Sequence, residues 1–97
     1  KDTVRGILLS YEKEESRGMI INLGSGKEIT MNALLQGICE YMGYSGDWEH
    51  RPERTSDVKN LCANIDRARK VLGFEPQMDF EDGIKETLDW YINESIL

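Results

Sequence analysis

Four stretches of this chain carry apolar residues at helical spacing, and polar, glycine-containing segments join them. The stripes are Val4, Ile7, Leu8 and Tyr11; Met31, Leu34, Leu35, Ile38 and Met42; Ile65, Ala68, Val71 and Leu72; Phe80, Ile84, Leu88, Tyr91 and Ile92. Spacings of three and four residues put each set on one face of a helix. Thr30 and Asp79 are suitable N-caps, while Gly43 and Gly73 are suitable stops. The sequence therefore predicts four short amphipathic helices.

One apolar run lacks the helical spacing. Met19–Leu23 is too brief for a helix and contains two isoleucines, which is typical of a buried strand. A further extended piece is predicted around Trp48, inside a turn-rich stretch. We predict an α+β fold of four helices with two or three short strands, or the helical lobe of an α/β protein. At this length, residues 1–97 should form a single domain.

Charge and hydropathy exclude two classes of partner. The formal net charge of −6 repels nucleic-acid phosphates and anionic lipids. Basic residues cluster only at Arg51–Arg54 and Arg67–Lys70, without the interleaved aromatic residues of single-strand binders. No apolar run approaches the ~20 residues of a membrane span, and the first residues lack a signal-peptide pattern. We predict a cytoplasmic protein that binds neither nucleic acid nor membrane.

The cysteines and the lone histidine predict neither a disulfide nor a metal site. Cys39 and Cys62 stand in apolar surroundings without paired spacing, which favours buried free thiols. With only His50 as a nitrogen ligand, a zinc site would have to recruit carboxylates. His50 also builds no convincing catalytic triad, so we predict no catalytic residue in this chain.

A glycine-rich turn at Gly24–Lys27 invites comparison with phosphate-binding loops. A Walker loop needs a glycine five residues before its Gly-Lys pair, where Ile21 stands. A dinucleotide fingerprint needs a third glycine, where Ile29 stands. The segment is therefore predicted to be a plain strand-to-helix turn.

The polar segment that begins at Arg51 holds the candidate binding residues. An arginine presents a planar fork for phosphate or carboxylate, and an aspartate accepts hydrogen bonds from ribose hydroxyls. Arg51, Arg54 and Asp57 together suit a nucleoside diphosphate. Spacing alone favours the alternative that Arg54 and Asp57, three residues apart, pair with each other at the surface.

Several ordered blocks resemble one family over nearly the whole chain. Arg54–Val58, Ala63–Ala68 and Leu72–Pro76 resemble Arg-Pro-Gly-Asp-Val, Ala-Asp-Ile-Ser-Lys-Ala and Leu-Gly-Trp-Glu-Pro. These are motifs of the C-terminal substrate-binding region of NAD-dependent sugar-nucleotide epimerases and dehydratases, the UDP-glucose 4-epimerase-like extended short-chain dehydrogenases. Asp2–Gly6 and Ile21–Gly26 resemble further blocks of that region. The resemblance implies the small C-terminal lobe of such an enzyme.

The resemblance also implies residue roles. Arg54 would contact the diphosphate of a nucleotide sugar and Asp57 its ribose hydroxyls. Thr55 and Ser56 replace the usual Pro-Gly, so the turn is expected to be less tight. Arg51 has no family counterpart. The Gly-rich NAD turn and the Tyr-x-x-x-Lys pair of the family are expected in an N-terminal Rossmann domain of a longer parent, so NAD should bind there.

Two functions remain open at this point. The chain is either the nucleotide-sugar-binding part of a longer epimerase or dehydratase, or a free-standing binding or protein-interaction module without catalytic activity. The helix predicted at the very first residues favours the tail of a longer chain. Without its partner domain, such a chain is expected to self-associate through exposed apolar faces. Base, sugar and reaction type are left open.

Overall fold

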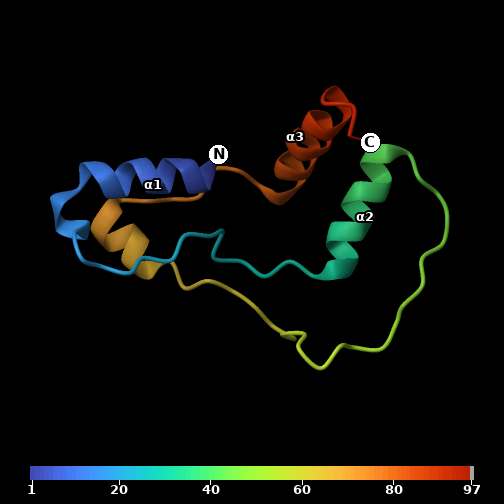
Figure 1. Cartoon of the computed structure of the whole chain (residues 1–97), viewed down its shortest axis with the longest axis horizontal. Helices are drawn as coiled ribbons and strands as arrows, with labels where there is room; N and C mark the ends of the chain where they lie inside the picture. Colours follow the sequence, from blue (N-terminus) through green and yellow to red (C-terminus); the bar gives the residue numbers. More distant parts are fainter. Residues whose placement is uncertain (97) are drawn as a thin grey trace. The chain divides into compact units, whose positions relative to one another are not determined.

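The computed structural model describes residues 1–96 (Figure 1). Its elements in chain order are the helix α1 (Asp2–Glu12), the 3-10 turn η1 (Glu14–Ser16), the helix α2 (Met31–Met42), the π-helical turn η2 (Ala68–Leu72) and the helix α3 (Phe80–Asn93). No helix in the described part of the chain is both long and apolar enough to cross a membrane.

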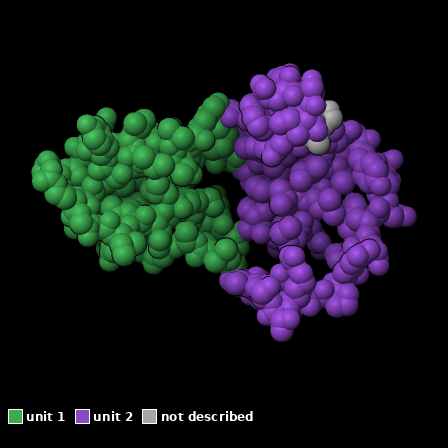
Figure 2. Space-filling view, in the orientation of Figure 1, with its two compact units in different colours: residues 1–28, 61–79 green, residues 29–60, 80–97 purple. Residues whose placement is uncertain are grey.

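The chain divides into two compact units, which Figure 2 shows in separate colours. The first unit combines residues 1–28 with 61–79, and the second combines residues 29–60 with the chain from residue 80 onward. α1, η1 and η2 therefore belong to the first unit, and α2 and α3 to the second. The single-domain organisation stays a prediction.

The predicted α+β fold is wrong, because the described part of the chain is helical and contains no strand. Met19–Leu23 is coil, and only its residues from Ile20 onward alternate in burial as a strand would: Ile21 packs against the core while Ile20 is 84% exposed. A strand also needs a neighbouring backbone for its hydrogen-bond ladder. Here the Ile20 carbonyl accepts instead from Arg67 Nη1 at 2.8 Å. The segment around Trp48 is likewise coil.

The core of the first unit lies in and around η2. Its buried members are Ile65, Ala68, Leu72 and Phe74, and the partly buried Leu9, Ile21, Leu23, Ala63 and Val71 pack against them. Gly73 ends η2 as predicted, with a left-handed φ of 64°. Because of this conformation, the Phe74 N–H reaches back to the Ala68 carbonyl at 3.2 Å. The predicted helix forms as an α-helical start at residues 66–67 that continues as the π-helical turn η2.

Helix α1 forms where predicted, but its apolar stripe does not face this core. Gly6 is the buried residue of α1, and a Cβ built there would lie 2.6 Å from Leu23 Cδ1. Glycine thus lets the helix backbone approach the extended segment closely. The residues of the predicted stripe are all more than half exposed, and we call this set the α1 stripe: Val4, Ile7, Leu8 and Tyr11.

The second unit pairs α2 with α3, which lie side by side in Figure 1. α2 has the predicted boundaries: Thr30 Oγ1 accepts the Ala33 N–H at 3.1 Å, and Gly43 ends the helix with φ 66°. Gly37 faces Ile84 of α3, and a Cβ at Gly37 would lie 2.8 Å from Ile84 Cδ1. The absence of a side chain at this position therefore brings the two helices together.

Both cysteines are free thiols, as predicted. The prediction that both are buried is wrong, because Cys62 is exposed and Cys39 is only partly buried. Its apolar neighbour Leu61 is exposed as well, because the chain becomes buried only from Ala63 onward, where it approaches the core. An apolar sequence context does not by itself bury a residue that precedes a packed segment.

Candidate nucleotide-binding loop

Arg54 and Asp57 lie on the exposed coil that follows α2, and a closed turn joins them. The Asp57 N–H donates to the Arg54 carbonyl at 3.0 Å. In the opposite direction, the Arg54 N–H donates to Asp57 Oδ2, also at 3.0 Å. The turn residues Thr55 and Ser56 stand between them. Two backbone N–H groups and one carbonyl are therefore satisfied locally, and the turn closes without a Pro-Gly pair.

The side chains of the same two residues also form an ion pair. Arg54 Nη2 lies 3.3 Å from Asp57 Oδ1, and Arg54 Nε lies 3.5 Å from Oδ2. The Arg54 side chain is 84% exposed and that of Asp57 is 41% exposed. Exposed pairs of this kind contribute only about 0–1 kcal/mol. The surface pairing considered from the sequence is thus present, and it leaves the guanidinium open to a stronger anion.

Arg51 lies on the same coil but pairs with a different carboxylate. Its Nη2 and Nε lie 3.3 Å and 3.4 Å from Glu49 Oε2, and both side chains are more than 70% exposed. This contact joins residues only two apart in the sequence. The structure therefore presents two arginines on one loop, each held by its own acidic neighbour.

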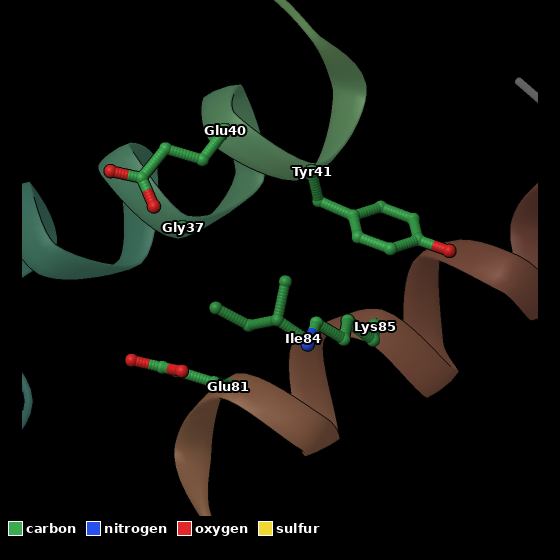
Figure 3. A pocket seen from close by; sticks show the side chains of 6 residues that line it. All are labelled: Gly37, Glu40, Tyr41, Glu81, Ile84 and Lys85. Atoms are coloured by element: carbon green, nitrogen blue, oxygen red, sulfur yellow. The ribbon is translucent and has the colours of Figure 1, made fainter.

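A pocket between α2 and α3 was missed by the sequence analysis (Figure 3). It measures about 350 Å³ and is lined by Gly37, Glu40, Tyr41, Glu81, Ile84 and Lys85. Figure 3 shows Ile84 between the two helices, the Glu40 and Glu81 carboxylates to its left and the Tyr41 ring reaching toward α3. The spacing of three and four residues on both helices is the signal that could have found it. Two glutamates and a lysine around one isoleucine are typical of the exposed edge of a helix–helix contact rather than of a specific ligand-binding site.

The Tyr41 hydroxyl donates to the Asp89 carboxylate across the two helices. This hydrogen bond, with desolvation and the Asp89 charge as smaller causes, raises the pKa of the Tyr41 phenol above its ordinary value of 10.0. Tyr41 therefore stays protonated at neutral pH and fastens α2 to α3. Nothing in this arrangement activates the hydroxyl as a base.

The glycine-rich segment Gly24–Lys27 is a local turn, but not the predicted strand-to-helix turn, because no strand precedes it among the described residues. The Ser25 hydroxyl donates a hydrogen bond to the Lys27 carbonyl at 3.1 Å. It also accepts one from the Lys27 N–H at 3.2 Å. The turn is therefore closed on itself rather than opened as a cradle for phosphate. Among the described residues, no three His, Cys, Asp or Glu side chains are grouped to hold a metal ion.

Comparison with known proteins gives no match to a family model, but it finds related whole proteins. A UDP-glucuronate 4-epimerase of Thermodesulfobacterium geofontis is 36% identical over 72 residues, which are 73% of this chain and 22% of that protein. The chain thus spans about a fifth of the length of this relative.

Two solved structures share the fold. An epimerase of Methanothermobacter thermautotrophicus superposes with a TM-score of 0.91 at 35% identity, covering 97% of this chain and 28% of that one. A UDP-glucose 4-epimerase of Thermotoga maritima, solved with UDP-glucose, superposes with a TM-score of 0.86 at 31% identity. That match covers 99% of this chain and 30% of the Thermotoga chain.

Proposed function

We propose that this chain, which matches the C-terminal region of the sugar-nucleotide epimerase/dehydratase family, binds the nucleoside diphosphate part of a nucleotide sugar. Arg54 would contact the diphosphate and Asp57 the ribose hydroxyls. The observation that carries the proposal is the turn from Arg54 to Asp57, which presents an 84% exposed guanidinium beside a carboxylate. The UDP-glucose in the Thermotoga maritima structure supports this class of ligand.

The chemistry of binding is an exchange of partners. Without ligand, the Asp57 carboxylate occupies the Arg54 fork at 3.3 Å and 3.5 Å. A diphosphate carries more charge than one carboxylate and offers the guanidinium two well-directed oxygens. Once Arg54 turns to the phosphate, the Asp57 oxygens can accept hydrogen bonds from the two ribose hydroxyls. Both groups then hold one nucleotide.

We further propose that the chain positions the substrate while another part of a longer protein supplies NAD and the reacting groups. The match covers only 22–30% of the relatives described above, and those relatives are epimerases. Positioning is itself a large share of catalysis, since it fixes the reacting carbon against the cofactor. In this proposal a Rossmann domain is the partner that completes the substrate pocket.

A second candidate function is a free-standing binding or interaction module. The α1 stripe favours it, because four large apolar residues in adjacent helical turns are more than half exposed. Such a stripe suits a protein partner. In the enzyme proposal the same stripe packs against the Rossmann domain. An exposed stripe therefore does not distinguish the two candidate functions, whereas nucleotide-sugar binding is expected only of the enzyme part.

The proposal can be tested by titrating this chain with UDP-glucose and comparing Arg54→Gln with Arg17→Gln. Arg17 is a matched control, since it also forms an exposed pair with an acid three residues away, Glu14. We expect Arg54→Gln to weaken binding at least fivefold and Arg17→Gln to leave it within twofold. Equal affinities of the two variants would rule out the diphosphate role of Arg54.

A further inference from the structure

The arginines of the described chain fall into two groups by the quality of their side-chain contacts. Four of them make close contacts that organise the fold or a local turn. Arg67 donates to the Ile20 carbonyl at 2.8 Å, Arg69 makes two bonds of 2.9 Å to Glu75, and Arg17 bonds Glu14 at 2.9 Å. Arg5 donates to the Glu75 carbonyl and lies 5.6 Å from the centre of the Phe74 ring. These hydrogen bonds are shorter than the side-chain contacts of the remaining two arginines, although the Arg17 pair is as exposed as theirs.

Arg51 and Arg54 form the second group. Their side-chain contacts to carboxylates are all 3.3 Å or longer, and their side chains are 81% and 84% exposed. Long, exposed contacts are weak and readily exchanged. Both arginines stand on the same coil, three residues apart. Arg51 and Arg54 are therefore neighbouring guanidiniums that can exchange their carboxylate partners for a ligand.

The loop is also less repulsive to an anion than the acidic chain as a whole. Residues 49–59 contain three basic and three acidic side chains besides His50, whereas the whole chain has a net charge of −6. One carboxylate stands at each exchangeable guanidinium, Glu49 at Arg51 and Asp57 at Arg54. Asp57 contacts the Arg54 guanidinium with both carboxylate oxygens, whereas Glu49 contacts Arg51 with Oε2 alone. A phosphate group can offer each guanidinium two oxygens. In the absence of ligand, each arginine therefore binds a carboxylate of this chain at the position where it would bind a phosphate.

We propose that Arg51 is a second phosphate-binding residue of this loop, contacting the phosphate next to the one that Arg54 contacts. The inference rests on the proposed function, because it concerns the same ligand. It assigns to the loop a preference for two linked phosphates over one. It also makes Glu49 a competitor of the ligand, since Arg51 must leave Glu49 before it binds phosphate.

Four single variants separate this role from a general effect of charge. Arg51→Gln is paired with Lys59→Gln, which removes the same charge from the same loop. Glu49→Gln is paired with Glu53→Gln, which removes one negative charge nearby. UDP-glucose and uridine monophosphate serve as the two-phosphate and one-phosphate probes in a titration of each variant. Since these side chains are exposed, circular dichroism should show unchanged folding.

We expect Arg51→Gln to weaken UDP-glucose binding by about three- to tenfold, and Lys59→Gln by less than twofold. Glu49→Gln should strengthen it more than Glu53→Gln does. With uridine monophosphate, the Arg51→Gln effect should fall below twofold. Equal losses for Arg51→Gln and Lys59→Gln would overturn the role of Arg51. If Arg54→Gln still weakened binding in that case, the proposed function would survive; if neither arginine mattered, both proposals would fail.

Discussion

Asp57 holds Arg54 at two places, because its carboxylate accepts the Arg54 backbone N–H at 3.0 Å and lies 3.3 Å from the Arg54 guanidinium. The first contact fixes the turn, and the second occupies the group that would bind phosphate. The backbone contact can persist when the guanidinium turns away. The loop can therefore exchange its ion pair for a ligand without losing its shape.

Substituting Asp57 should separate these two contacts. Asp57→Asn keeps an acceptor for the Arg54 N–H, so we expect hydrogen exchange at that amide to stay as slow as in the unsubstituted chain. Asp57→Ala removes the acceptor, and exchange at Arg54 should become several times faster. Both variants should change the free energy of unfolding by less than about 1 kcal/mol, since the pair is exposed. Unchanged exchange in Asp57→Ala would contradict the turn described above.

Truncation of the core should unfold the first unit. Phe74 is buried in the cluster around η2, and Phe74→Ala should cost about 3–5 kcal/mol. That is a large part of the stability of a small domain. Hydrogen exchange should show loss of protection across residues 1–28 and 61–79. Tyr11→Ala, at an exposed position, is the control and should leave protection intact.

Acid should loosen the segment that precedes α3. The pKa of Asp2 lies below its ordinary value of 3.8, mainly because the Met78 N–H donates a hydrogen bond to Asp2 Oδ2 at 2.9 Å. The Gln77 N–H and the Arg5 charge lower this pKa further, while desolvation raises it. A lowered folded-state pKa means that Asp2 stabilises the fold above the unfolded-state pKa. That contribution is lost as the pH falls through the folded-state pKa.

An NMR titration of the Gln77 and Met78 amides checks this dependence. Both amides should shift as the pH falls below about 4, the region of the ordinary aspartate pKa. Asp2→Asn should abolish most of that shift and lower stability slightly at neutral pH. An identical titration in the unsubstituted chain and in the Asp2→Asn variant would mean that another group controls the segment.

The α1 stripe should drive self-association of this chain. Leu8→Lys places a charge in the middle of the stripe and should raise the dissociation constant of any self-associated form about tenfold or more. Leu61→Lys is the control, because Leu61 is also exposed but lies outside the stripe. Sedimentation velocity over a range of concentrations measures both. Equal behaviour of the two variants would exclude the stripe as the contact surface.

The features predicted correctly from the sequence are local. Thr30 and Gly43 bound α2 as expected, because a cap and a left-handed stop each depend on a few neighbouring residues. The pairing of Arg54 with Asp57 was foreseen for the same reason. Met19–Leu23 is the short apolar run with two isoleucines that is typical of a strand, yet a strand also requires a second backbone that no short pattern supplies.

The features that sequence reasoning missed depend on distant parts of the chain. The spacing of the α1 stripe predicts an amphipathic helix but not which face meets the core, and here Gly6 decides it through its close approach to Leu23. The pocket between α2 and α3 needs Tyr41 and Ile84, which come from two helices far apart in the sequence. Such contacts follow from packing rather than from local spacing.

Chemical-shift mapping of the isotope-labelled chain with UDP-glucose tests the central claim most directly, because it reports both binding and its place. The account predicts shifts that saturate with ligand and centre on the amides of Arg54 to Asp57, extending to Arg51. The residues around the α2–α3 pocket, such as Tyr41, should stay unchanged. Shifts absent from the Arg54 to Asp57 turn, or confined to the α2–α3 pocket, would contradict it.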